Sequence, residues 1–243
     1  MAKLPTLISE QPEIEAQVFH ALEAERAMRP PKSGLYLSGI GDCPRKQWAL
    51  RRGEAPEDLP GEVLANFEVG NAVEDLVVGL LERAGYQIRD RQMRLVMDLG
   101  DGLVASGRID GIIKLKRENA ILEIKSAKEE QFEMAQTVGY RAWQPKYAAT
   151  LDCYMGASGI PVGLAVVFNK GHVPRKNRLL YAERLRLDVA NFERMRARAR
   201  LVMSTESAPI RPDDATSRFC QFCKYCHLNA RCWGPTWDAK FDE

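Results

Sequence analysis

The sequence predicts an α/β fold in which a central mixed β-sheet is flanked by helices. A long amphipathic segment at 62–84 is followed by three segments of strand character, and helical and strand segments then alternate to about residue 203. Strands that first run in a meander and then alternate with helices are typical of a mixed sheet with helices packed on it.

Helices are predicted where apolar residues recur at helical spacing or where helix-start signals occur. The segment 62–84 carries one apolar stripe, formed by Leu64, Phe67, Val73, Leu76, Val77, Leu80 and Leu81. A helix at 9–28 has Ser9 as a candidate cap and Pro12 in its first turn. A short helix is expected in "DCPRKQWALRRG", with Asp42 as its cap. Further helices are predicted at 129–138, 142–157 and 189–203.

Strands are predicted at 86–99, 103–116 and 120–126, and in the segments "PVGLAVVFNK" and "RLLYAERLRLD". If "KREN" at 116–119 is a four-residue hairpin loop, Leu115 pairs with Ala120 and Asp110 with Lys125. Asp110 would then lie diagonally from Glu123, close enough for both carboxylates to reach one ion.

Composition indicates a globular protein without a membrane span. The chain has 243 residues, of which 45% are hydrophobic and 28% are charged, as is usual for such proteins. No apolar run approaches the ~20 residues that cross a bilayer, and the first residues lack the apolar core of a signal peptide. We therefore expect a cytoplasmic protein. The net charge of +2 gives no general argument for nucleic acid, so that case depends on local patches.

One strand face gathers charged groups of opposite sign. In "ILEIKS", Glu123 and Lys125 alternate with Leu122 and Ile124 and so share a face, with Asp110 on the preceding strand. Mg²⁺ is usually bound by one or two carboxylates together with waters and phosphate oxygens. A metal-activated water and a clamp on developing charge suffice to hydrolyse a phosphodiester. A solvated hairpin with an ion pair across it explains this local pattern equally well.

The cysteines are concentrated near the C-terminus. Cys220, Cys223, Cys226 and Cys232 lie within thirteen residues, and in a reducing compartment such a cluster is more often a metal site than a set of disulfides. With His227 the segment offers five ligands. Structural zinc needs four nitrogen or sulfur ligands and a [4Fe–4S] cluster needs four thiolates, so the spacing alone fits both. Cys153, on an apolar helical segment, is expected to be a buried core thiol.

Basic residues are concentrated in two stretches that a polyanion could bind. They are Arg184, Arg186, Arg194, Arg196, Arg198 and Arg200 in one stretch, and Arg45, Lys46, Arg51 and Arg52 in the other. A solvated helix balanced by acids elsewhere is the alternative. Nearby Tyr and Trp side chains could stack on single-stranded bases.

The segments "GRIDG" and "ILEIKSA" together resemble the core of the PD-(D/E)XK nuclease superfamily, in its RecB-like branch. Gly70 and Glu74 in "FEVGNAVEDL" are similar to the G-x-x-x-(H/E) motif of that branch. The segment "DCPRKQWALRRG" resembles the N-terminal cysteine segment of its iron–sulfur members, and the C-terminal C-x₂-C-x₅-C completes the set. The resemblance covers about residues 35–235.

The resemblance implies a restriction-endonuclease-like core that uses Mg²⁺ or Mn²⁺. Asp110 and Glu123 would be metal ligands together with the carbonyl of Ile124. Lys125 would orient the attacking water, and Glu74 would be a ligand at the edge of the site.

The branch also has a Q-x-x-x-Y helix that contacts DNA, and here this chain departs from the pattern. Thr150 stands where Gln is expected, with Tyr154 at the Tyr position. The literal match, Gln136 and Tyr140, lies only eleven residues after Lys125.

The resemblance further favours a [4Fe–4S] cluster over zinc, held by Cys43, Cys223, Cys226 and Cys232. Closing the long loop back to Cys43 costs more entropy than using Cys220, but the difference grows only as the logarithm of loop length. Metal binding energies of ~10–16 kcal/mol exceed it, and a helix N-terminus beside Cys43 favours a thiolate. The cluster would staple the N- and C-terminal segments together.

The implied domains are an N-terminal helical extension at 1–34, one nuclease domain at 35–235 with cysteine segments at 35–55 and 218–235, and a tail at 236–243. The implied activity is a DNA exonuclease acting on ends or single strands, in recombination and repair, phage DNA metabolism or CRISPR adaptation. Its partners would be DNA, recombination or CRISPR integration proteins, and a second copy of the chain. It would act in a bacterial cytoplasm, encoded by a bacterium or a phage. The alternatives are a non-catalytic, metal-stapled DNA-binding subunit and an RNA-processing nuclease.

Overall fold

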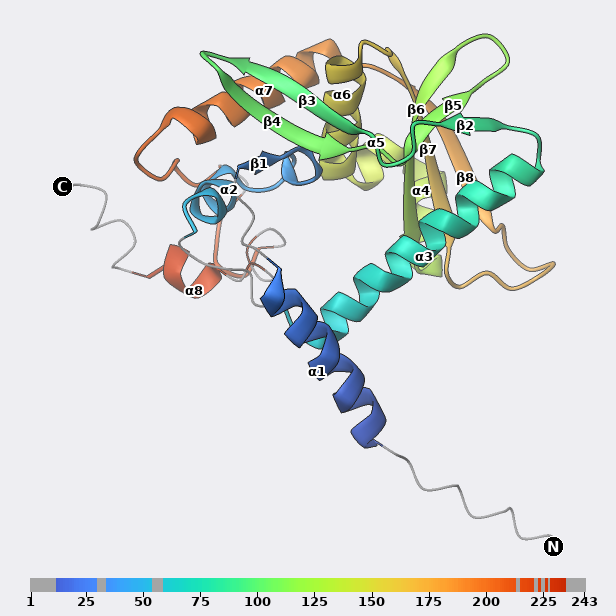
Figure 1. Cartoon of the computed structure of the whole chain (residues 1–243), viewed down its shortest axis with the longest axis horizontal. Coiled ribbons are helices and arrows are strands. Elements are labelled where there is room, and N and C mark those ends of the chain that lie inside the picture. Colours follow the sequence, from blue (N-terminus) through green and yellow to red (C-terminus); the bar gives the residue numbers. More distant parts are fainter. Residues whose placement is uncertain are drawn as a thin grey trace, which may run out of the picture.

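The computed structural model describes residues 12–29, 34–53, 59–212, 215–220, 223, 226 and 228–234. Within them it confirms an α/β fold with mixed sheets flanked by helices (Figure 1). The helices are α1 (Pro12–Met28), the 3₁₀ helix η1 (Leu37–Gly39), α2 (Pro44–Arg51), α3 (Gly61–Arg83), α4 (Glu129–Val138), α5 (Tyr140–Trp143), α6 (Pro145–Ser158), α7 (Val189–Ser204) and α8 (Asn229–Cys232). The strands are β1 (Leu35–Tyr36), β2 (Gln87–Arg89), β3 (Arg94–Gly100), β4 (Leu103–Arg108), β5 (Gly111–Lys114), β6 (Asn119–Ala127), β7 (Val162–Asn169) and β8 (Leu180–Arg186).

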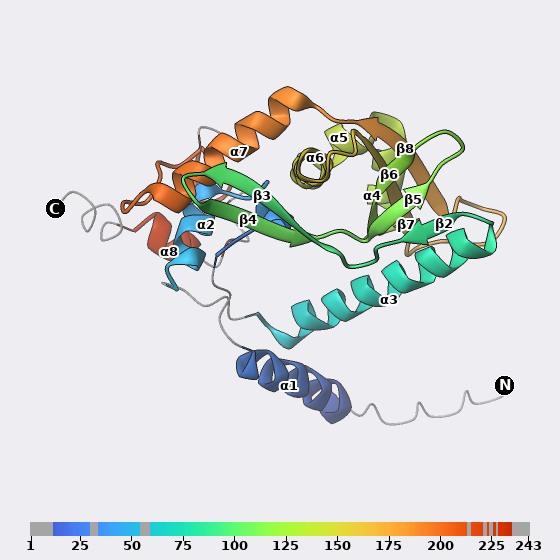
Figure 2. The ribbon, with the colours of Figure 1, turned by 45° about the horizontal axis from the view of Figure 1, so that its top comes forward.

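The larger sheet has the strand order β2-β5-β6-β7-β8, so β6 lies at its centre. The β6 and β7 strands are parallel, and the other neighbouring pairs are antiparallel. On one face, Leu122 and Ile124 of β6 pack with Val77 of α3. On the other, Ile121 packs with residues of α4 to α6 such as Phe132. Figure 2 shows the sheet between these helices. Each face of β6 is therefore covered by helix.

The smaller sheet has the order β1-β4-β3, and α6 and α7 pack on it. The sequence analysis predicted single strands at 86–99 and 103–116, and both predictions are wrong in the same way. Each segment is divided between the two sheets, with β2 and β5 in the larger and β3 and β4 in the smaller. Asp90 and Gln92 have positive φ values of 54° and 55° where the first segment turns. The second breaks at Ile109 and Asp110, so Asp110 lies where the chain crosses between the sheets.

The β5–β6 hairpin differs from its predicted register by two residues. Lys114 pairs with Asn119 and Ile113 with Ala120, and the loop at 115–118 is closed by a hydrogen bond from Leu115 N to Glu118 O of 2.9 Å. A shift of two keeps every side chain on its predicted face, because side chains alternate with a period of two. Continued by one position, this register places Asp110 level with Glu123 instead of diagonal to it.

Two helix starts also differ from the predictions. Asp42 does not cap α2, because Cys43 is the N-cap residue and Pro44 takes the first helical position. Asp42 instead forms an ion pair with Lys146 at 2.9 Å. The helix predicted at 142–157 begins earlier and is broken at Gln144, since the residue before a proline disfavours the helical conformation and α6 starts at Pro145.

The N-terminal helix α1 packs along α3. A Cβ atom on Gly61 would lie 2.3 Å from Phe19 Cβ, so the two helices meet where α3 begins. Glu23 Oε1 accepts a 2.6 Å hydrogen bond from Gly61 N at the same place. The predicted cap Ser9 lies outside the described residues. Among the helices that the structure describes, none combines the length and apolarity of a bilayer span.

Candidate active site

The central strand β6 carries two of the predicted site residues. Glu123 is only 3% exposed, and its Oε1 lies 2.6 Å from Lys125 Nζ. The same ammonium donates a 3.0 Å hydrogen bond to the carbonyl oxygen of Ile124. Because β6 has a neighbouring strand on each side and Glu123 is buried, a solvated hairpin does not describe this face. The Glu123 carboxylate and the Lys125 ammonium are therefore held together within the fold.

Asp110 is joined to the same strand through the backbone. Ile124 N donates a 2.6 Å hydrogen bond to Asp110 Oδ2. Burial, and then the charge of Glu123, raises the pKa of Asp110 to about 7. Burial by itself would lower the pKa of Lys125, but Glu123 and Asp110 outweigh it and raise that pKa above its ordinary value. The two carboxylates therefore repel each other, and the lysine relieves only part of the repulsion.

Glu74 reaches this group from α3, which packs on the opposite face of the sheet. Gln92 Nε2 donates a 2.6 Å hydrogen bond to Glu74 Oε1. Burial, and then the charge of Asp110, raises the pKa of Glu74. Gly70, one turn earlier, has open space around it. The structure thus brings Glu74 to the edge of the acidic pair, where the resemblance placed it.

Tyrosines from α5 and α6 lie beside the acidic pair. Tyr154 is buried, and its hydroxyl would lie 2.9 Å from a Cβ atom on Gly107 of β4. Burial, followed by the charge of Glu123, raises the pKa of both Tyr154 and Tyr140. Among the described residues, the buried hydroxyl of Tyr140 has no hydrogen-bond partner. Both tyrosines weighed in the sequence analysis therefore lie near the site.

The polar partners expected in the Q-x-x-x-Y motif do not join the tyrosines at the site. Thr150 is buried and its hydroxyl donates to the carbonyl oxygens of Leu37 and Lys146, each at 3.2 Å. Gln136 is half-buried on α4, and no hydrogen bond of the described residues ties it to the site. Thr150 therefore ties α6 to η1.

Sequence reasoning missed Tyr147. Lys125 Nζ lies 5.2 Å from the centre of its ring, and Trp143 stands beside it at a centroid distance of 6.4 Å. Tyr147 is 36% exposed, so its ring borders both the lysine and solvent. A signal was present, because Tyr147 and Tyr154 are seven residues apart and so share one helix face.

The acidic pair is chemically suited to a hard divalent cation. Two carboxylates and the Ile124 carbonyl oxygen are the ligand types that Mg²⁺ and Mn²⁺ accept. Burial, and then the charge of Glu123, raises the pKa of Asp110, and a cation would stabilise its ionised form. Within the described ranges, three or more His, Cys, Asp or Glu side chains are nowhere arranged to hold an ion. Waters or substrate oxygens would have to complete the coordination shell, as is common for Mg²⁺.

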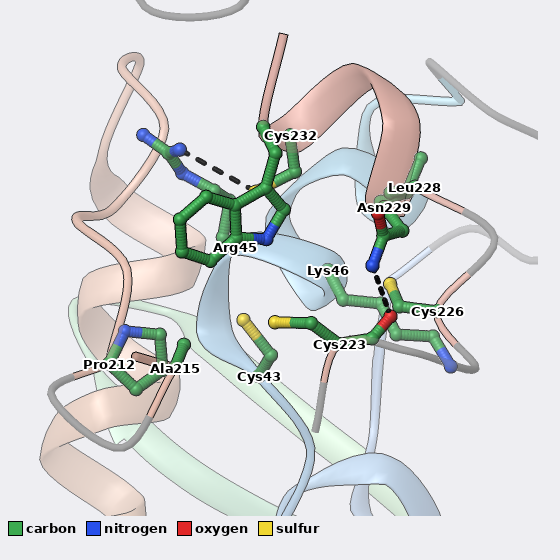
Figure 3. Close-up of a pocket in the computed structure, with 11 residues that line it drawn as sticks. Cys43, Arg45, Lys46, Pro212, Ala215, Cys223, Cys226, Leu228, Asn229 and Cys232 are labelled. Atoms are coloured by element: carbon green, nitrogen blue, oxygen red, sulfur yellow. Dashed lines mark hydrogen bonds between the residues drawn. The ribbon is translucent and has the colours of Figure 1, made fainter. Parts of the chain in front are cut away.

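A separate pocket brings the predicted cysteines together. Cys43, Cys223, Cys226 and Cys232 all line it (Figure 3). Cys43 comes from the start of α2 and Cys232 from α8, so the pocket joins segments far apart in the sequence. Cys220 is not among its lining residues, although it forms a hydrogen bond with Cys223. His227 lies outside the described residues.

The surroundings of the Cys43 thiol shift its pKa in opposite directions. Burial raises the pKa of Cys43, and the backbone N–H groups of Lys46 and Arg45 partly oppose it. The backbone N–H groups at the start of α2 therefore lower the pKa of Cys43 as expected, but burial raises that pKa by more. Arg45 donates to Cys232 Sγ at 3.6 Å. Four thiols line this pocket, and four thiolates are the donor set of a [4Fe–4S] cluster and equally of zinc, although the described cysteines are not converged around one point in this structure.

Most of the predicted basic surface is occupied by protein partners. Arg196 donates to the carbonyl oxygen of Asp98 at 2.8 Å, Arg198 to that of Ile40, and Arg200 pairs with Asp101. In the other group, Arg45 donates to the carbonyl oxygen of Pro209 at 2.9 Å and Arg51 to that of Met203 at 2.7 Å. These guanidinium groups fasten α2 and α7 to the body, and because most of their acceptors are neutral carbonyl oxygens, the arginines keep their positive charge.

Comparison with known proteins yields a likeness of fold. No protein-family model matches the chain, and no curated protein matches it. The alkaline exonuclease LHK-Exo from Laribacter hongkongensis has a similar structure, with a TM-score of 0.53 and 12% identity over 78% of this chain and 91% of that one. Its complex with dAMP gives a TM-score of 0.51 and 12% identity over the same shares of the two chains. The protein SSO0001 gives 0.50 and 13% identity over 89% of this chain and 97% of its own.

Proposed function

We propose that this protein is a metal-dependent nuclease that hydrolyses DNA phosphodiester bonds at ends or in single strands. The observation that carries the proposal is that Asp110 and Glu123 are both held on the strand β6, with Lys125 paired to Glu123. Ile124 N binds Asp110 at 2.6 Å, and Lys125 Nζ lies 2.6 Å from Glu123. The likeness of fold to an alkaline exonuclease, solved also with dAMP, supports it.

A Mg²⁺ or Mn²⁺ ion bound here would activate a water and neutralise charge on the phosphate. Asp110, Glu123 and the carbonyl oxygen of Ile124 would hold it. Lys125 remains protonated, because the neighbouring carboxylates raise its pKa. Its ammonium can therefore orient a water molecule and place positive charge beside the scissile phosphate. Glu74, at the edge, can accept a hydrogen bond from a water of that site.

The aromatic residues favour an unpaired substrate. The ring of Tyr147 lies against Lys125 and is partly exposed, so a base next to the scissile phosphate can stack on it. Base stacking on an aromatic ring is worth ~1–3 kcal/mol and is tolerant of sequence. A stacked base must leave its own duplex, which favours single strands and frayed ends.

The thiols of Cys43, Cys223, Cys226 and Cys232 are proposed to hold a structural [4Fe–4S] cluster, with zinc as the alternative. Their shared pocket supports this. The cluster would fasten the segment that precedes α2 to the C-terminal segment that ends in α8. Recombination and repair, phage DNA metabolism and CRISPR adaptation are the settings that such an activity fits.

The test is a cleavage assay on end-labelled single-stranded DNA, duplex DNA and RNA. Each substrate is incubated with Mg²⁺, with Mn²⁺ or with EDTA. We expect cleavage of single-stranded DNA that requires the metal, and slower cleavage of blunt duplexes. Binding of all three substrates without any cleavage would instead indicate a DNA-binding subunit, and cleavage restricted to RNA would reassign the substrate.

A further inference from the structure

The loop between β7 and β8 exposes a group of basic side chains with no acidic partners. The loop runs from 170 to 179, and Figure 1 shows it projecting beyond the end of the larger sheet. Its exposed cations are Lys170, Arg175, Lys176 and Arg178. Among the described residues, none of the four forms an ion pair. Glu129 contacts the loop by accepting a hydrogen bond from the amide of Asn177.

Two asparagines hold this loop in place. Asn177 Oδ1 accepts a 2.7 Å hydrogen bond from Val173 N, and its amide nitrogen donates to the Glu129 carboxylate and, at 3.3 Å, to the Gly171 carbonyl oxygen. The second asparagine, Asn169, is 1% exposed. It accepts from Gly171 N at 2.8 Å and donates to the carbonyl oxygen of Arg178 at 3.2 Å. The basic side chains therefore project from an ordered scaffold.

One basic residue of the loop adopts a costly backbone conformation. Arg175 has φ = +66°, a region that non-glycine residues seldom enter. Such strain persists only where the surrounding structure imposes it, and it is concentrated at functional segments. Asn177 follows Arg175 and is hydrogen-bonded to Val173 and Gly171, which precede it. These bonds across Arg175 provide that constraint. The loop thus maintains a strained tip while it exposes positive charge.

The loop begins near the acidic pair, at the carboxyl ends of β6 and β7. Val167 of β7 pairs with Lys125 of β6, and Lys170 N donates to the carbonyl oxygen of Ala127 at 2.8 Å. At ~3.3 Å per strand residue, the loop begins about 10 Å beyond Lys125. The loop is also braced on Glu129, in the first turn of α4. That helix covers the sheet face that carries Glu123 and Lys125.

We infer that this loop binds the phosphate backbone of a nucleic-acid strand a few nucleotides away from the bond that is cut. The inference rests on the proposed nuclease function and adds to it a contact outside the acidic pair. A strand within a duplex rises ~3.4 Å per nucleotide and an unpaired strand extends further, so a separation of about 10 Å corresponds to about two or three nucleotides. The loop adds a group of exposed cations to the arginines of α7, most of which are hydrogen-bonded to protein groups.

The test compares two double variants of equal charge change. K176A/R178A removes two cations of the loop and leaves Arg175, whose backbone is strained, in place. K116A/R117A is the matched control, because these exposed residues lie in the β5–β6 hairpin loop at the other end of β6. Affinity for a 5′-fluorescein-labelled 20-nucleotide DNA single strand is measured in EDTA over a range of salt concentrations. Thermal midpoints check that both variants are folded.

We expect K176A/R178A to flatten the slope of log affinity against log salt by about 1.4, since each phosphate contact contributes ~0.7 for single strands. The control should retain the wild-type slope. In Mn²⁺, K176A/R178A should cleave the 20-nucleotide strand at least several-fold more slowly than wild type does under subsaturating conditions. It should cleave a trinucleotide at the wild-type rate, because a trinucleotide has two internucleotide phosphates, and the one that is not cut is too close to the cleavage site to reach the loop.

Different results separate the loop from the proposed function. An unchanged slope for K176A/R178A in a protein that cleaves DNA would overturn the loop inference and leave the nuclease proposal intact. Equal loss on the trinucleotide and the long strand would also overturn it, because the loop would then act on the site itself. A wild-type protein that cleaves neither substrate would contradict the nuclease function, whatever the binding slopes.

Discussion

The backbone N–H of Ile124 donates a 2.6 Å hydrogen bond to the carboxylate of Asp110. Ile124 stands between Glu123 and Lys125 on the central strand, so one bond fixes Asp110 to the strand that carries its two partners. Asp110 itself lies where the chain crosses from one sheet to the other. The site is therefore carried by the strand β6 and by the backbone hydrogen bond that fixes Asp110 to it. Side chains on regular elements are positioned more accurately than side chains on loops.

The charge on Asp110 is expected to destabilise the metal-free protein. Its pKa is about 7 against an ordinary value of 3.8, so the folded state binds the proton more tightly than the unfolded state does. The contribution of Asp110 to stability should therefore be largest below about pH 4, fall as pH rises towards about 7, and then level off. Asp110→Asn keeps an acceptor for Ile124 N and removes the charge. At pH 8 it should stabilise the metal-free protein by about 1–3 kcal/mol, given ~1.4 kcal/mol per pKa unit.

Chemical unfolding in EDTA at pH 4, 6 and 8 measures this effect. The advantage of Asp110→Asn over wild type should grow from pH 4 to pH 8. Asp75→Asn is a suitable control, because that exposed carboxylate pairs with Arg91 on the surface and lies outside the acidic pair. If Asp110→Asn were less stable than wild type at pH 8, the proposed cost of burying the Asp110 charge beside Glu123 would be contradicted.

The ring of Tyr147 is expected to contribute to the binding of an unpaired base. Tyr147→Ala should lower kcat/KM on single-stranded DNA by about 5- to 150-fold, the range that corresponds to ~1–3 kcal/mol of stacking. Tyr147→Phe keeps the ring and should remain within about twofold of wild type. Steady-state cleavage of a labelled single strand checks both variants. If alanine and phenylalanine give equal rates, the ring is only packing against Lys125.

Cys43 and Cys220 distinguish the long-range cysteine set from the local one. Cys43→Ser should lose the bound metal and much of the stability, because Cys43 lines the pocket with Cys223, Cys226 and Cys232. Cys220→Ser should retain both. Iron, sulfide and zinc contents of anaerobically purified protein, together with the visible absorbance, report the outcome. Metal kept by Cys43→Ser and lost by Cys220→Ser would show that the local set is the correct one.

The elements that the sequence predicted well have strong periodic patterns. The apolar stripe gave the helix α3 correctly, although Phe67 and Leu76 of the predicted stripe are exposed. The alternation in β6 gave the right element on the right faces. The exchange of strands between two sheets was missed, because it depends on positive φ values at Asp90 and Gln92. Neither residue is a glycine, so the sequence does not mark these positions as ones with positive φ. The hairpin register was wrong by two, since a shift of two leaves the hydrophobic pattern unchanged.

The acidic pair was readable as a strand pattern, whereas its surroundings were not. Tyr147 lies against Lys125 only because α6 crosses the sheet face there. The arginines of α7 read as a free basic surface, and their acceptors, such as Ile40 and Asp98, are backbone carbonyl groups far away in the sequence. The basic loop after β7 depends on hydrogen bonds of Asn169 and Asn177, and no sequence spacing reveals them.

The most direct measurement is metal-dependent cleavage by Asp110→Asn and Glu123→Gln on the same labelled DNA single strand. Both substitutions preserve shape and hydrogen-bond acceptors, so folding and DNA binding should be retained. We predict cleavage in Mn²⁺ by wild type, none in EDTA, and a rate lowered by at least ~10²–10³-fold in each variant, as is found when one charge-stabilising group of an active site is removed. Wild-type rates in both variants would contradict the assignment of the chemistry to this acidic pair.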